Sequence, residues 1–171
     1  MSSFFKKIKF ARIYDQYVEK IYRFIFIKVS SYEVAQDLTS ETFLKAWRVY
    51  KENNTEIKSI SGFLYKIARN LVIDYYRQKK QHQSVSLETI EHLDIKSSHN
   101  PLASFIFDQE LKRIYQAIKK IKPEYQEVII WYYLDELSVK EIAKILDKSE
   151  NAIRLLIHRG LKELRQILKE K

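Results

Sequence analysis

The stretch LSVKEIAKILDKSENAIRLLIHRGLKEL, residues 137–164, predicts two short helices joined by a tight turn. Ser138 and Glu141 have the spacing of a capping box at the start of the first helix. Asp147 lies in the predicted turn, and Ser149 can cap the second helix by accepting a backbone N–H. A helix pair of this kind is typical of the helix-turn-helix motif, whose second helix enters the major groove of DNA.

The second helix of this pair has one apolar face and one basic face. Apolar side chains recur at helical spacing from Ile153 to Leu168. The opposite face is typical of a groove-binding helix, although a helical hairpin with a solvated basic surface has the same pattern. The residues of this face are Asn151, Arg154, Leu155, His158, Lys162 and Arg165. The candidate DNA contacts on and beside this helix are Ser149, Asn151, Arg154, Leu155, His158, Arg159 and Lys162.

The composition favours an all-helical protein with a polyanionic partner. The 171-residue chain contains only two glycines and two prolines, which is few for a protein built of sheets and turns. Its formal net charge of +9 favours nucleic acid or an anionic membrane surface as the partner. There is no cysteine, which excludes disulfides and thiolate metal sites. No signal peptide or apolar run of membrane-spanning length is evident, so we expect a cytoplasmic protein.

Helical periodicity predicts a three-helix domain in the first part of the chain. Ser30 and Glu33 have capping-box spacing at the start of the second helix, and Ser61 opens the third. The segment before the first helix is expected to be a short extension, residues 1–8, and residues 53–59 are expected to be a loop. The predicted helices span about 10–29, 30–52 and 61–80, within a domain of residues 1–81.

A polar, weakly periodic stretch, residues 82–100, is the predicted linker to a second domain of four helices, residues 101–171. Pro101 and Pro123 stand at the first position of its first two helices. The run VIIWYYL has high β propensity, but no partner strand is evident, so we assign it to the helix that begins at Pro123. The predicted fold is therefore all-α, with two small helical domains.

No motif for catalysis, for a metal or for a cofactor is evident. The four histidines are scattered without metal-ligand spacing, and no glycine-rich phosphate loop is present. The carboxylates mostly alternate with lysines along the predicted helices, which is ordinary surface patterning. We therefore expect a binding protein without catalytic residues, metal, cofactor or small-molecule substrate.

AQDLTSETFLKAWRVY and SGFLYKIARNLVIDYYRQKK form one block of sequence, and KPEYQEVIIWYYLDELSVKEIAKIL with NAIRLLIHRGLKELR forms a second. In this order the blocks resemble regions two and four of RNA polymerase sigma factors of the extracytoplasmic-function type, the compact branch of the sigma-70 family. The resemblance implies an alternative sigma factor that binds core RNA polymerase and directs promoter recognition and opening. It also implies promoter DNA as a partner and an anti-sigma factor as the regulator.

The resemblance further implies roles for individual residues. Region four is expected to contact the polymerase flap and to recognise the upstream ("minus thirty-five") promoter element, with Leu155 and Leu156 where the family commonly has Ser and Arg. The docking face for the clamp coiled coil of the largest polymerase subunit corresponds to Asp37, Leu38, Ser40, Glu41 and Phe43. The contacts with the downstream ("minus ten") element correspond to Asn53, Asn54, Lys58, Phe63, Lys66, Asn70, Asp74 and Arg77.

Two other functions fit part of the sequence. One is a two-domain helix-turn-helix regulator that binds DNA without docking on polymerase. The acidic pair Asp37 and Glu41 argues against it, although two solvated acids near the start of a helix need no partner. The other is a basic helical protein of the membrane surface. The short, capped helices with interrupted basic faces argue against a long amphipathic anchor.

Overall fold

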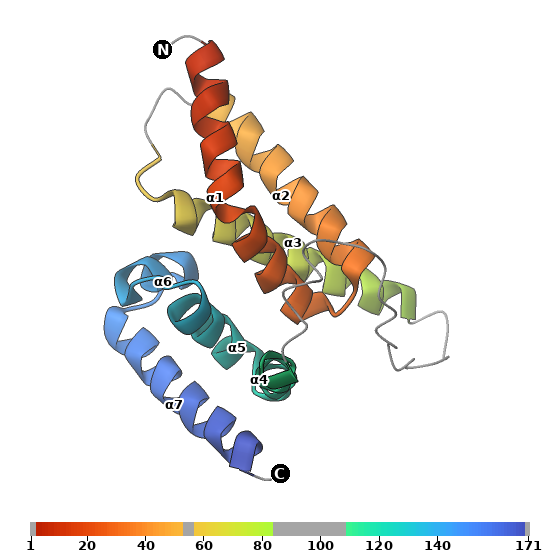
Figure 1. The fold of residues 1–171 in the computed structure, drawn as a ribbon, viewed down its shortest axis with the longest axis vertical. Coiled ribbons are helices and arrows are strands. Elements are labelled where there is room, and N and C mark those ends of the chain that lie inside the picture. The colour runs from red at the N-terminus through yellow and green to blue at the C-terminus, as the bar shows by residue number, and fades with distance from the viewer. Residues whose placement is uncertain (1–2, 53–56, 84–108, 170–171) are drawn as a thin grey trace. The chain divides into compact units, whose positions relative to one another are not determined.

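The computed structural model describes residues 3–52, 57–83 and 109–169 (Figure 1). The chain divides into two compact units, Met1–Lys96 and Ser97–Lys171. Every regular element within the described residues is a helix, so the predicted all-α fold is confirmed. Most of the predicted linker, residues 84–100, and the first part of the predicted next helix, 101–108, lie outside the described residues.

The first unit is a bundle of α1 (Ser3–Val29), α2 (Tyr32–Glu52) and α3 (Ile60–Gln83), in which each helix packs against the other two. α3 crosses the other two helices (Figure 1). The core lies around the C-terminal half of α1, where Phe24 packs edge-to-face on Tyr65 of α3 with ring centroids 5.7 Å apart. Further fully buried side chains of this bundle are Ile21, Ile25, Ala35, Ala46, Leu64 and Ala68.

α1 begins at Ser3, so the prediction of a short extension before residue 10 is wrong. Aromatic packing carries the helix toward its N-terminus, because Phe10 contacts Trp47 of α2 with ring centroids 5.1 Å apart. One turn earlier, the Nζ of Lys6 donates a hydrogen bond of 2.9 Å to the carbonyl of Lys51. These contacts hold the first turns of α1 along α2.

Two of the predicted helix caps are displaced. Ser30 has a φ of 58° and donates its backbone N–H to the carbonyl of Phe26, so it ends α1, and the hydroxyl of Ser31 accepts the N–H of Val34. Ser59 caps α3 by accepting the N–H of Gly62 at 3.2 Å. The predicted cap, Ser61, is instead buried within the first turn.

The second unit packs α7 (Glu150–Lys169) against α4 (Gln109–Lys120), α5 (Pro123–Ile129) and α6 (Val139–Leu146). Gly160 permits a close approach of α7 to α5. A Cβ atom at this position would lie 3.1 Å from both Ile129 Cγ1 and Tyr125 Cβ. Because α5 and α6 together cover the inner side of α7, the other side of α7 is left for solvent or a partner.

The run VIIWYYL is helical, as predicted, but its last part widens into a π-helix, η2 (Ile130–Leu134). The backbone N–H of Asp135 donates to the carbonyl of Ile130 at 3.0 Å, which is the π spacing. Trp131 is fully buried, whereas Tyr132 and Tyr133 are exposed. None of the described helices has an apolar stretch of the length that a bilayer span requires.

Candidate nucleic-acid interface

The helix-turn-helix forms as its local sequence predicts. Ser138 and Glu141 make the complete capping box, in which the Ser138 hydroxyl accepts the Glu141 N–H at 3.3 Å and the Glu141 carboxylate accepts the Ser138 N–H at 3.0 Å. Asp147 ends α6 in the left-handed conformation, with φ 53° and ψ 50°. The Ser149 hydroxyl accepts the N–H of Ala152 at 3.2 Å and so caps α7. The turn between the two helices is therefore fixed by local hydrogen bonds.

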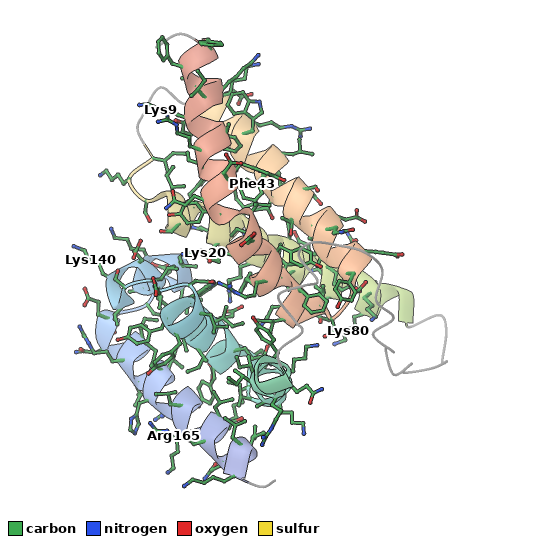
Figure 2. All side chains as sticks on the ribbon, in the orientation of Figure 1. Lys9, Lys20, Phe43, Lys80, Lys140 and Arg165 are labelled. Atoms are coloured by element: carbon green, nitrogen blue, oxygen red, sulfur yellow. The ribbon has the colours of Figure 1, made fainter. Side chains whose placement is uncertain are left out.

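α7 presents the predicted DNA contacts on its exposed side. The side that faces α5 and α6 buries Ile153, Ile157, Gly160 and Leu164. Figure 2 labels Arg165 on the outer side of this helix. All seven candidate contacts on and beside α7 are exposed: Ser149, Asn151, Arg154, Leu155, His158, Arg159 and Lys162.

Arg154 is held in one orientation by two neighbours in the first turn of α7. Its Nη2 lies 3.0 Å from Glu150 Oε2, and its Nη1 donates to Asn151 Oδ1 at 3.0 Å. A guanidinium has five N–H donors, so this arrangement orients the group and leaves donors for a ligand. An oriented arginine in a major groove can donate to both O6 and N7 of guanine.

A shallow hollow of about 420 Å³ continues this surface toward the C-terminal end of α7, and it is lined by His158, Leu161, Lys162, Arg165, Gln166 and Lys169. Three of these side chains are cationic, so the hollow suits a strand of phosphates. Neither Arg165, which the sequence already places on the basic face, nor Lys169 is among the candidate contacts. The spacing of three and seven residues from Lys162 is the sequence pattern that puts both on the same face as that lysine.

Five of the predicted contacts for the downstream element lie on α3. Phe63 is half-buried, and Lys66 follows it as an exposed cation one turn later. Asn70 is exposed on the same helix. Asp74 and Arg77 are exposed and pair with each other, with 3.2 Å between Asp74 Oδ1 and Arg77 Nη1. Of the three predicted contacts in the preceding loop, Lys58 is exposed. The other two, Asn53 and Asn54, lie outside the described residues.

The predicted docking residues lie on α2. Asp37, Ser40 and Glu41 are exposed, Leu38 is half-buried, and Glu41 pairs with Lys45 at 2.9 Å. Phe43 is only 5% exposed and lies between α1 and α2 (Figure 2). Its ring centroid is 4.8 Å from that of Tyr14, so Phe43 supports the acidic surface from beneath.

No cluster of histidine and carboxylate side chains suited to a metal ion occurs within the part of the chain that the structure describes. The groups gathered on α7 and α3 are hydrogen-bond donors, cations and aromatic rings. Together they can bind phosphates, base edges and unstacked bases.

Two family models match the chain, one in each compact unit. Sigma-70 region 2 matches residues 13–82, and Sigma-70 region 4 matches residues 111–164. The chain is 34% identical over 160 residues to the ECF RNA polymerase sigma factor BldN of Streptomyces coelicolor, which covers 93% of this chain and 60% of that protein. It is 30% identical over 168 residues to the ECF RNA polymerase sigma factor SigW of Bacillus subtilis, which covers 94% of this chain and 89% of SigW.

Solved structures have the same fold. The sigma factor RpoE of Bartonella quintana, in complex with the anti-sigma factor NepR, superposes with a TM-score of 0.76 and 21% identity, covering 94% of this chain and 97% of that chain. CnrH, in complex with the cytosolic domain of CnrY, gives a TM-score of 0.72 at 18% identity and covers 96% and 90% of the two chains. Similarity at these identities is a likeness of fold.

Proposed function

Because the chain belongs to the extracytoplasmic-function branch of the sigma-70 family of RNA polymerase sigma factors, we propose that it binds core RNA polymerase and directs promoter recognition and opening. The observation that carries this proposal is that the two family regions fall one in each compact unit, in the order of the family. A DNA-binding regulator that never docks on polymerase would need only the helix-turn-helix unit. The protein would act in the cytoplasm, by binding rather than by catalysis.

The helix-turn-helix unit is proposed to recognise the upstream promoter element. α7 would enter the major groove, where the oriented guanidinium of Arg154 donates to base edges. The cations of the hollow, Lys162, Arg165 and Lys169, would follow a phosphate strand and fix the register of the helix without selecting a sequence.

The three-helix unit is proposed to hold the non-template strand of the downstream element once the duplex opens. A single-stranded base needs a flat apolar surface, a polar group for its Watson–Crick edge and a cation for its phosphate. On α3 these groups are Phe63, Asn70 and Lys66 in that order, and Lys58 adds a second exposed cation just before the helix.

The acidic surface of α2 is proposed as the docking site for the clamp coiled coil of the largest polymerase subunit. Asp37, Ser40 and Glu41 supply the exposed groups, and Phe43 keeps α2 in place against α1. The helix-turn-helix unit would contact the polymerase flap. An anti-sigma factor is proposed as the regulator, a proposal supported by the RpoE–NepR complex of the same fold.

Charge reversal tests the docking surface. We expect the double variant Asp37→Lys/Glu41→Lys to lose binding to core polymerase, because it replaces both acids and places a lysine next to Lys45. A matched control is Asp15→Lys/Glu19→Lys, which reverses two exposed acids at the same four-residue spacing on α1. Fluorescence anisotropy of labelled protein titrated with core polymerase measures the affinity, and circular dichroism checks the helical content.

The control variant should bind core polymerase nearly as tightly as the natural protein does. The docking variant should keep its helical content and bind at least tenfold more weakly, with most of the loss in the association rate at low salt. If the docking variant is folded and binds core polymerase normally, the assignment of the docking site to the acidic surface of α2 is wrong. Failure of the natural protein to bind core polymerase at all would contradict the proposed function itself.

A further inference from the structure

One apolar side chain, Leu155, stands in the middle of the exposed polar face of α7. The buried positions of this helix are Ile153, Ile157, Gly160 and Leu164. At about 100° per residue, Leu155 points almost directly away from the centre of that buried stripe. Its side chain is 47% exposed. The core of the unit therefore gives no reason for a leucine at this position.

The neighbours of Leu155 on this face are all groups that suit DNA. Asn151 precedes it by one helical turn, and Lys162 follows it by two, both exposed. Arg154 is beside it in the sequence, with its guanidinium turned toward Glu150 and Asn151 in the first turn. Leu155 thus lies among the proposed base and phosphate contacts, close to the N-terminal end of the helix, where base contacts cluster in this motif.

The chemistry of the major groove offers one partner for such a side chain. Of the four bases, only thymine presents an apolar group there, its C5-methyl; the other base edges offer hydrogen-bond donors and acceptors. A leucine side chain can neither donate nor accept a hydrogen bond. Against a polar base edge it would displace water and leave the donor or acceptor of the base without a partner. The same side chain against a methyl group buries apolar surface on both sides.

We propose that Leu155 selects a thymine in the upstream element by packing on its C5-methyl group. This inference rests on the proposed function, since it requires α7 to lie in the major groove. Because Arg154 and Leu155 are adjacent on the helix, the thymine is expected within about two base pairs of the base that Arg154 contacts. The thymine could lie on either strand of the base pair that Leu155 contacts.

Removing the methyl group alone tests the proposal. Holoenzyme, assembled from core polymerase and the full chain, is first used to select its upstream element from a randomised duplex library. Each thymine of that element is then replaced by deoxyuridine, which lacks the C5-methyl and keeps the same base pairing. We expect one replacement to weaken binding about three- to fivefold, which is the effect of one buried carbon group.

The Leu155→Ala variant closes the cycle. It should bind the thymine duplex about as weakly as the natural protein binds the deoxyuridine duplex, and the replacement should then have no further effect. The matched control is Leu168→Ala, at an exposed leucine near the far end of α7, which should keep the full sensitivity to deoxyuridine. Both leucines are exposed, so both variants should keep the helical content of the natural protein.

Three results would overturn the inference: no sensitive thymine anywhere in the element, a selected element without thymine, or a deoxyuridine effect that persists in Leu155→Ala. A holoenzyme that selects no duplex sequence at all would instead contradict the proposed function. If Leu155 is an ordinary solvated surface residue, neither the deoxyuridine replacement nor Leu155→Ala should alter binding.

Discussion

Arg154 is an exposed side chain whose orientation is set by its own helix. Its guanidinium is bound by Glu150 and Asn151, which lie four and three residues earlier on the same helix face. We expect Arg154→Ala to lower the affinity for the cognate upstream element by about 1–3 kcal/mol and to relax selection at one position. Holoenzyme binding to a set of single-base variants of the element measures both effects.

Lys162 provides the control for this prediction, because it is exposed on the same helix and belongs to the basic hollow. Lys162→Ala should weaken binding to all sequences alike and reduce the salt slope by about one unit. A uniform loss for Arg154→Ala as well would assign that arginine to the phosphate rather than to a base.

Tyr22 is a second residue whose environment leads to a prediction. Its side chain is buried, and its hydroxyl has no hydrogen-bond partner among the described residues. Burial, with a smaller contribution from Tyr32, raises the pKa of Tyr22 from 10.0 to about 12. Because burial disfavours the ionised side chain, Tyr22 adds no pH dependence to the free energy of unfolding below about pH 10, and it lowers that free energy as the pH rises from about 10 toward 12.

Tyr22→Phe removes both the unpaired hydroxyl and its ionisation. We expect the free energy of unfolding to rise by about 1 kcal/mol at neutral pH, because a buried polar group without a partner is removed. Its fall above pH 10 should become less steep. Urea unfolding at pH 7 and pH 11 measures both, with Tyr14→Phe as a control at an exposed tyrosine of the same helix. If the Tyr22→Phe variant is less stable than the natural protein at neutral pH, the Tyr22 hydroxyl does make a hydrogen bond in the folded protein.

At the scale of the element, the sequence predicts helix ends well where one local motif decides them. The capping box of Ser138 and Glu141, the turn at Asp147 and the cap at Ser149 all form as predicted. Ser30 does not cap α2, because it ends α1 in the left-handed conformation and the hydroxyl of Ser31 accepts the Val34 N–H. Ser61 does not cap α3, because it is buried in the first turn and the hydroxyl of Ser59 accepts the Gly62 N–H.

The π-helix was not predictable from periodicity. The apolar run from Val128 to Leu134 has no gap that marks one face, so the sequence leaves its helical pitch undetermined. Tertiary packing sets it, with Trp131 turned into the core and Tyr132 and Tyr133 outward. A π turn provides this by inserting one residue into the helical ladder.

Gly160 is an interior helical glycine, and the close contact of α7 with α5 explains it. We expect Gly160→Leu to lower the free energy of unfolding of the second unit by about 1–3 kcal/mol, because a side chain there overlaps Ile129 and Tyr125. Gln166→Leu adds the same side chain at an exposed position of α7 and should have little effect. Thermal unfolding of both variants tests this, and equal stability would contradict the close packing of the two helices.

At the scale of the whole molecule, the two sequence blocks carried more information than single residues did. They indicated both family regions, which the family models confirm, whereas the binding faces assigned to α2, α3 and α7 stay predictions. The blocks could not indicate how deeply a side chain is buried. Phe43 was therefore assigned to the docking face of α2, although its side chain is buried beneath that face. The second block ends at Arg165, so it did not include Lys169, and Arg165 was placed on the basic face of the helix without being assigned as a contact.

Strand opening, which is proposed for the three-helix unit, would separate a sigma factor from an ordinary DNA-binding regulator. Stacking of a base on an aromatic side chain is worth about 1–3 kcal/mol, which is comparable to the cost of unstacking one base. Losing Phe63 or Asn70 should therefore return the promoter to duplex, whereas the contact through Arg154 is in the other unit and should persist. We expect Phe63→Ala and Asn70→Ala holoenzymes to bind duplex promoter and to form little open complex.

A premelted bubble template should restore transcription by these variants, because it removes the opening step. Gln78→Ala, at an exposed residue of the same helix, is the matched control and should open promoters normally. Equal failure of Asn70→Ala on duplex and bubble templates would place its defect in a step other than strand capture.

Permanganate footprinting of unpaired thymines, on promoters recovered by the holoenzyme, shows directly whether this protein opens promoters. Core polymerase alone should leave the downstream element unreactive, addition of this protein should make its thymines reactive, and the Asn70→Ala holoenzyme should bind the same fragments with little reactivity. Promoter opening by this protein would be contradicted if the natural holoenzyme bound the fragments and left their thymines unreactive. It would also be contradicted if core polymerase alone made the thymines equally reactive.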